Sequence, residues 1–293
     1  MQGLTQNKYQ FGLLVLVNAF VGGMVGLERA VIPGLARGVF GIDANTEVLS
    51  FVAAFGISKA ISNYSVAKLT KKYNRKTILI TGWLFAVPVA LLLMYAPNWN
   101  WILVANILLG INQGLAWSST VIMKIDLVGN KNRGLAMGIN EFAGYLSVGL
   151  ASYLASSIAA HYGFAFFPFI PCLAFAALGL MMSVFLIKNT NHFVHAESST
   201  SNISLLKNVG KDTIWKHKNI SSVTLNDLVN NMNDGVVWGL LPLLLIQRGF
   251  SISHIGIVAG IYPVVWGVSQ LFTVKMGDGY CKKNHYNRYV TIE

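Results

Sequence analysis

The chain has 293 residues, of which 54% are hydrophobic and only 11% are charged. Soluble globular proteins carry about 25% charged residues, so this composition excludes a soluble domain with a single core. The net charge of +11 could indicate a nucleic-acid partner, and the distribution of the basic residues along the chain decides that question.

Apolar blocks between charged or turn-rich breaks set the class of the protein. A helix of about 20 mostly apolar residues crosses the bilayer core, because it satisfies its own backbone polar groups. We therefore predict an all-α, multi-pass membrane protein. Its eight predicted spans are residues 11–34, 47–66, 78–96, 101–123, 135–158, 165–187, 221–246 and 254–274.

The basic residues fall on one side of this topology. With the N-terminus in the cytoplasm, 18 of the 22 Lys and Arg residues lie in the N-terminal segment, the C-terminal tail and loops 67–77, 124–134 and 188–220. Such an asymmetry is the positive-inside signature of a membrane protein. It predicts a cell-membrane protein with both termini in the cytoplasm, bound to the lipid bilayer and without a nucleic-acid partner.

Polar residues inside the first, fourth and fifth spans are candidates for substrate or proton binding, since charges in the bilayer usually face a bundle interior or a water cavity. An ion pair within the protein is an equal alternative for the acid–base pair of the first span, and a gate role is an alternative for the acid of the fifth. A lysine of the second span, Lys59, is expected to snorkel to the interface. The candidates are Glu28, Arg29, Asn106, Gln113, Trp117 and Glu141.

The seventh span has the densest polar pattern. Asp227, Asn231, Asp234 and Trp238 follow each other at i, i+4, i+7 and i+11, which places them on one helical stripe. A neighbouring stripe carries further amides, including the candidates Asn230 and Asn233. Amides and an acid beside an aromatic ring suit a polar organic substrate, and hydrogen bonding between helices is the alternative.

The first and seventh spans resemble each other, which indicates an internal repeat of six spans. Asn18, Val21 and Met24 match Asn226, Val229 and Met232 at an offset of 208 residues. The run AKLTKKYNRK at 67–76 likewise returns as VKMGDGYCKK at 274–283. We therefore expect a bundle at 1–187, a cytoplasmic linker at 188–220 and the first two helices of a second bundle at 221–293.

Parallel repeats of six helices are the plan of the major facilitator superfamily, and the chain resembles that family in its repeated basic loops. The family pattern there is Gly-x-Leu-x-Asp-basic-x-Gly-basic-basic. In the second loop Asp278 fits the Asp position, whereas Lys71 occupies it in the first. The resemblance implies that these loops lock the two halves on the cytoplasmic side through Lys71, Arg75, Lys76, Asp278, Lys282 and Lys283.

The resemblance implies a secondary transporter that moves a small organic solute by alternating access. Efflux in exchange for protons is the leading expectation, and metabolite uptake is its rival. Because the second bundle has two helices of six, the alternative is an inactive fragment or membrane partner protein that self-associates. The sequence contains no Walker loop, metal-ligand cluster or nucleophile motif, so we expect no enzyme, cofactor or metal.

Overall fold

The regular secondary structure is helical in the part of the chain that the computed structural model describes, which comprises residues 3–129, 133–193 and 218–290. The side chains of 218–220, 275 and 277–290 are outside this description. Short connections separate the main helices, which are α1 (Lys8–Gly38), α2 (Asn45–Val48), α3 (Ser50–Lys72), α4 (Arg75–Met94), α5 (Trp99–Val128), α6 (Arg133–Tyr162), α7 (Ile170–Phe185), α10 (Lys218–Gly235), α11 (Leu241–Gln247) and α12 (Ile252–Val290).

The eight predicted spans correspond to eight helical regions, and the protein is an all-α, multi-pass membrane protein. Six of these regions are long and apolar enough to cross a membrane. The other two are α3, and α10 with α11, which are joined by a π-helical turn at Val236–Leu240. Both regions carry polar or charged residues along one side, and it is between these sides that the structure has a cavity.

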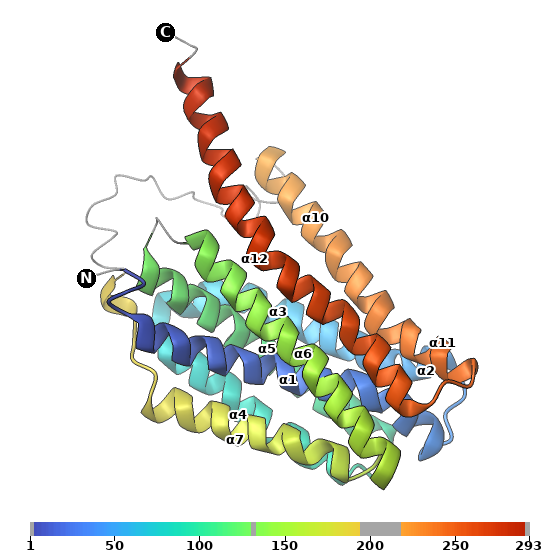
Figure 1. The fold of residues 1–293 in the computed structure, drawn as a ribbon. Coiled ribbons are helices and arrows are strands. Elements are labelled where there is room, and N and C mark those ends of the chain that lie inside the picture. Colours follow the sequence, from blue (N-terminus) through green and yellow to red (C-terminus); the bar gives the residue numbers. More distant parts are fainter. Residues whose placement is uncertain (1–2, 130–132, 194–217, 291–293) are drawn as a thin grey trace.

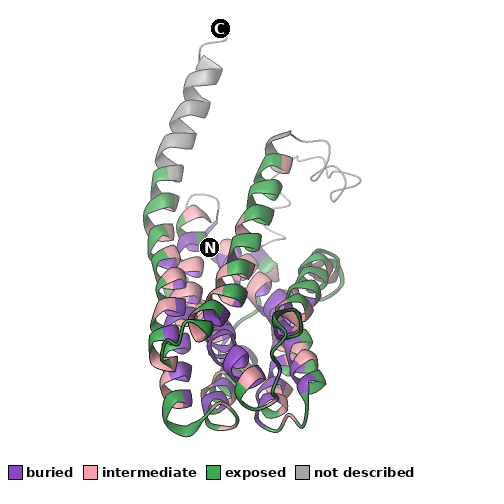
Figure 2. Ribbon diagram, turned by 90° about the vertical axis from the view of Figure 1, so that its right-hand side faces the viewer, coloured by how far each residue is buried: buried purple, intermediate pink, exposed green. Residues whose placement is uncertain are grey.

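The helices form a bundle around α1 and α5, with α10 and α12 on one side (Figure 1). α1 and α12 both pack along α6, α3 and α4 pack against α5, and α7 packs on α1 and α4. Buried residues gather in the helices of the first half, whereas α10 is exposed along most of its length (Figure 2). Residues of α3 and α10 line a common cavity.

Small residues allow α1 and α6 to pack backbone against backbone. A Cβ atom added to Gly22 would lie 2.2 Å from the carbonyl oxygen of Gly144, and one added to Gly26 would lie 2.1 Å from that of Val148. In a membrane, helices associate through such close packing because lipid supplies no hydrophobic driving force between them. This contact fixes α6, and with it Glu141, relative to α1.

Two helices extend further than the sequence indicated. Lys124, which the prediction placed in a cytoplasmic loop, lies within α5 and is 1% exposed. Its ammonium group donates hydrogen bonds to the side-chain oxygen of Asn140 and the carbonyl of Leu14, so the buried charge has partners and the helix can continue. The run 274–283, predicted as a loop, is part of α12.

Candidate functional site

The seventh-span stripe faces a cavity, here called the arginine chamber. Asp227, Asn231, Asp234 and Trp238 all line it, and its volume is about 470 Å³. That volume lies within the range of about 300–1,000 Å³ typical of small-molecule sites. The opposite wall comes from α1 and α3 and includes Arg29, Val52, Phe55, Gly56, Lys59, Ala60 and Asn63.

A second cavity of about 380 Å³, here called the glutamate chamber, shares part of its lining with the arginine chamber. The residues that line both chambers are Lys59, Asn63, Asp227, Asn231 and Trp238. The two chambers therefore adjoin between the first-half helices and the helices α10 and α12. The residues that line only the glutamate chamber are Gln113, Trp117, Ser118, Met137, Glu141, Tyr145, Val148, Asn230, Trp266 and Gln270.

The carboxylate of Asp234 connects three helices at the junction of the chambers. It accepts a hydrogen bond of 3.2 Å from the hydroxyl of Tyr145 on α6 and one of 2.7 Å from that of Tyr262 on α12. The Tyr262 hydroxyl also accepts a 2.9 Å bond from the amide of Asn233. Asp234 is 5% exposed, and hydrogen bonds from two hydroxyls satisfy a carboxylate that would otherwise be costly to bury.

Tyr145 is the centre of an aromatic cluster that borders both chambers. Its ring lies 6.0 Å from that of Trp117, 6.2 Å from that of Trp238 and 6.1 Å from that of Trp266, measured between centroids. These distances fall within the range of about 4.5–7 Å over which aromatic pairs attract each other. The cluster thus joins α5, α6 and α12 to the π-helical turn that follows α10.

Glu141 is the acid of the glutamate chamber, and its Oε1 accepts hydrogen bonds from Trp117 Nε1 at 3.3 Å and Asn140 Nδ2 at 2.8 Å. Asn140 in turn bonds with Lys124, and its backbone carbonyl accepts from Asn18 at 3.0 Å. A buried network of polar groups therefore connects the chamber wall with α1 and α5.

Comparison with known protein families identifies the family of this chain. The model of the Major Facilitator Superfamily matches residues 13–279. The chain belongs to the Major Facilitator Superfamily. It is therefore a transporter of small solutes across a membrane and not an enzyme. No curated protein matches the sequence.

The superfamily fold is also visible among solved structures. The crystal structure of a D-xylose-proton symporter matches with a TM-score of 0.61 and 18% sequence identity. The match covers 92% of this chain and 69% of the symporter chain. At this identity the likeness concerns the fold.

Most of the predicted binding residues line the two chambers of this superfamily member, but Glu28, Asn106 and Asn233 line neither. The amide of Asn233 donates to the Tyr262 hydroxyl instead. Glu28 is fully buried in α1, lines neither chamber, and has no hydrogen-bond partner among the described residues for either carboxylate oxygen. Asn106 is also fully buried and donates to the carbonyl of Ile102 in its own helix, at 3.0 Å. The neighbour of Glu28, Arg29, does line the arginine chamber.

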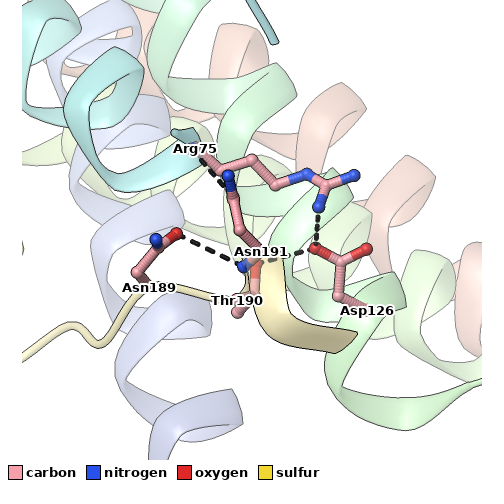
Figure 3. A network of polar contacts seen from close by, with 5 residues as sticks. All are labelled: Arg75, Asp126, Asn189, Thr190 and Asn191. Carbon is pink, nitrogen blue, oxygen red and sulfur yellow. Dashed lines mark hydrogen bonds and ion pairs between the residues drawn. The ribbon is translucent and has the colours of Figure 1, made fainter. Parts of the chain in front are cut away.

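The first of the basic loops typical of the superfamily takes part in a polar network at the end of the bundle where the N-terminus lies (Figures 1 and 3). Arg75 Nη1 lies 2.8 Å from Asp126 Oδ2, which also accepts a 2.7 Å hydrogen bond from the hydroxyl of Thr190. The backbone N–H of Arg75 donates to Asn191 Oδ1 at 3.4 Å, and that of Asn191 donates to Asn189 at 3.4 Å. The segment after α7 is thereby attached to α4 and α5.

The other predicted gate residues differ in their surroundings. Lys76 Nζ donates to the carbonyl of Val184 at 2.8 Å, whereas Lys71 is exposed. Asp278, Lys282 and Lys283 have side chains outside the described ones. The lock between the two halves of the superfamily fold therefore stays a prediction.

Sequence reasoning missed several residues of the chamber walls. Lys59 was expected to snorkel, but it lines both chambers. Asn63 and Tyr145 were not singled out, although they follow Lys59 and Glu141 by four residues and so share their helical faces. This spacing was a usable signal. The chamber residues Trp266 and Gln270, and Tyr262 that bonds with Asp234, also follow each other by four residues, and this shared face of α12 was missed as well.

Proposed function

We propose that the protein performs secondary active transport of a small organic solute by alternating access, with proton movement coupled to solute movement. The observation that carries this proposal is the pair of adjoining chambers between the first-half helices and α10 and α12. Ionisable residues within spans are costly unless they face such a cavity, and Arg29, Lys59, Asp234 and Glu141 all do so.

Asp234 is the proposed coupling group. It lies at the junction of the chambers and is bonded to α6 and α12 through two tyrosine hydroxyls. Protonation would remove its charge and weaken these bonds, because hydrogen bonds to an ionised acceptor are roughly twice as strong as neutral ones. Gain or loss of a proton would then change how firmly α10 is held against α6 and α12. The similarity to a proton symporter supports coupling to protons.

The proposed setting is the cell membrane, with both termini in the cytoplasm, in keeping with the positive-inside distribution. The two halves would rock against each other around the chambers, as in other members of the superfamily. Two modes are possible, efflux of the solute in exchange for protons and uptake of the solute together with protons. In the first mode protons move opposite to the solute, and in the second they move with it.

The test uses purified protein in liposomes that contain a pH-sensitive dye. Addition of a transported solute should change the internal pH in the wild type, and the sign of the change gives the direction of coupling. Asp234→Asn should abolish this solute-driven proton movement or uncouple it from the solute, because an amide cannot take up and release the coupled proton.

The matched control is Asp43→Asn, which removes an acid from an exposed position in the α1–α2 connection. It should leave the proton movement unchanged. Solute-driven proton movement of wild-type size in Asp234→Asn would remove Asp234 from the coupling mechanism. Absence of movement with every solute tested would count against transport by this chain and favour a membrane partner protein.

A further inference from the structure

Two basic side chains of the first half, Arg29 on α1 and Lys59 on α3, face the arginine chamber. The guanidinium carbon of Arg29 lies 5.0 Å from the ring centroid of Phe51 and 4.4 Å from that of Phe55. Lys59 Nζ lies 5.8 Å from the Phe55 centroid. The aromatic rings thus hold both cations on the same wall.

The guanidinium of Arg29 has no hydrogen-bond acceptor for two of its nitrogens within the described part of the chain. Arg29 is 3% exposed, and its Nε and Nη1 are buried without a partner. A buried charge is normally paired, because the cost of removing it from water is several kcal/mol. Cation–π contacts recover about 2 kcal/mol, so the guanidinium retains unused donors beside an open chamber.

Two of the three acids that line the chambers are bonded to other groups. Asp234 accepts from Tyr145 and Tyr262, and Glu141 accepts from Trp117 and Asn140. No ion pair is found between any of these acids and Arg29 or Lys59 in the described residues. Asp234 and Glu141 therefore take their hydrogen bonds from neutral groups, and neither cation has a carboxylate within ion-pair distance among the described residues. Glu28, which precedes Arg29 in α1, is the nearest acid in the sequence, but it lines neither chamber and its oxygens accept no hydrogen bond from a described residue.

We infer that the transported solute is an organic monocarboxylate whose carboxylate binds between Arg29 and Lys59. This inference rests on the proposed transport function and names the chemical class of its substrate. A guanidinium presents a fork of N–H donors that matches the two oxygens of a carboxylate. The body of the solute would lie against Phe55 and Trp238, with the amide of Asn231 on the α10 side, since all three line the chamber.

The opposite wall favours a single negative charge. Asp227 and Asp234 line the chamber from α10, opposite the wall that carries Arg29 and Lys59, here called the cationic wall. A dianion such as a phosphate monoester would bring a second charge towards these acids. A zwitterion would need an acceptor for its ammonium group on the α10 wall, where both oxygens of Asp234 already accept from tyrosine hydroxyls and Asp227 is exposed to solvent. One carboxylate supplies an acceptor for Arg29 and Lys59 without bringing a second negative charge towards the acids of α10.

The test is calorimetric titration of the purified chain in mild detergent with four probes of one ring and different charge. Benzoate, benzamide, benzylamine and phenyl phosphate carry a single negative charge, no charge, a positive charge and up to two negative charges. Benzoate should bind at least tenfold more tightly than benzamide, which corresponds to one charge-assisted hydrogen bond, and more tightly than the other two probes.

Substitutions on the cationic wall provide the second arm. Arg29→Gln and Lys59→Gln should each weaken benzoate binding at least tenfold and leave benzamide binding unchanged, while Arg29→Lys should recover part of the loss. Lys68→Gln is the matched control, because Lys68 lies on the same helix as Lys59 and its ammonium lies 5.0 Å from the ring of Tyr64, outside both chambers. It should bind benzoate like the wild type. Size-exclusion profiles identify any variant that fails to fold.

Several outcomes would overturn the inference. They are benzamide or benzylamine binding as tightly as benzoate, phenyl phosphate binding more tightly, no binding of benzoate at millimolar concentration, or benzoate affinity that survives both glutamine substitutions. Failure of the substrate class is distinguishable from failure of the transport function. Vesicle transport of a neutral or cationic solute without benzoate binding leaves transport intact, whereas benzoate binding without movement of any carboxylate leaves the site intact.

Discussion

Asp126 receives contacts from two different parts of the chain, and this makes it informative at the scale of single residues. Its Oδ2 pairs with Arg75 at the start of α4 and accepts from Thr190 in the segment after α7. The side chains of Arg75 and Asp126 are 16% and 9% exposed, so solvent screens this pair less than a surface ion pair. The carboxylate thereby holds the last segment of the first half in place.

Asp126→Asn should lower the thermal stability of the solubilised protein. Removal of the charge weakens the hydrogen bonds from Arg75 and Thr190, and bonds to charged groups contribute about 1.5–3 kcal/mol. We expect the melting temperature, followed by intrinsic fluorescence, to fall by several degrees.

Thr190→Val is the companion variant, because it removes the hydroxyl that donates to the same oxygen, and it should lower the melting temperature by a smaller amount. A melting temperature of wild-type value in both variants would show that this network does not stabilise the fold. Asp43→Asn again serves as the exposed control.

At the residue scale, the sequence predicts the position of a polar group better than its partner. The i, i+4, i+7 pattern correctly placed Asp227, Asn231, Asp234 and Trp238 on one face. It could not name the tyrosine hydroxyls that bond with Asp234, because they come from two other helices. Lys124 was misplaced for the same reason, since its partner Asn140 lies across the helix interface.

At the scale of helices, α1 requires glycine at Gly22, where it meets α6, but not at Gly12. A Cβ atom on Gly22 would lie 2.2 Å from a backbone oxygen, which cannot rotate away, whereas one on Gly12 would meet nothing within 4 Å. The two glycines share a helix and differ only in what lies opposite them.

Gly22→Ala should therefore destabilise the protein, because the two helices must separate to accept the methyl group, and overpacking costs about 1–3 kcal/mol. Gly12→Ala should be neutral or stabilising by up to about 1 kcal/mol, from the higher helix propensity of alanine. Thermal unfolding in detergent measures both. Equal melting temperatures for the two variants would contradict the close contact.

The helices themselves were largely predictable, because long apolar blocks dictate them. Their ends were less so. The predicted fourth span stopped before Lys124, yet α5 continues to Val128, and α12 continues through the run 274–283. Charged residues suggested an end in both places, but a helix can continue wherever its side chains find partners or water.

At the scale of the whole molecule, membrane orientation is the first prediction to check. In a background without Cys172 and Cys281, a single cysteine at position 71 should react with a membrane-impermeant thiol reagent only after the cells are opened. The reason is the excess of Lys and Arg on that side of the predicted topology.

A single cysteine at position 98, between α4 and α5, is the matched control and should react in intact cells. Labelling of position 71 from outside intact cells would reverse the assignment. The boundaries at 187 and 220 and self-association stay predictions, and mass measurement in detergent addresses self-association.

The chambers are a property of the whole molecule, because no single span of the sequence predicts them. Each wall could be read as one polar face, on α3, α5, α6 or α10, but the sequence does not state which faces oppose each other. The unpartnered state of Arg29 became visible only once the acids were seen to bond with tyrosine, tryptophan and asparagine. Periodicity therefore predicts a face, and only assembly determines what that face meets.

The contact between α6 and α12 has a mechanical consequence. A Cβ atom on Gly149 would lie 2.6 Å from the backbone oxygen of Gly260, and one on Gly260 would lie 2.8 Å from that of Gly149. Gly256 and Gly267 of α12 also face α6 closely. In the proposed rocking motion these helices belong to opposite halves, and between Gly149 and Gly260 only backbone atoms would have to move past each other. Gly260→Leu would place a large side chain at this point: solute affinity should persist while the transport rate falls, as measured by binding and flux on the same sample, and an unchanged rate would show that the two helices do not slide.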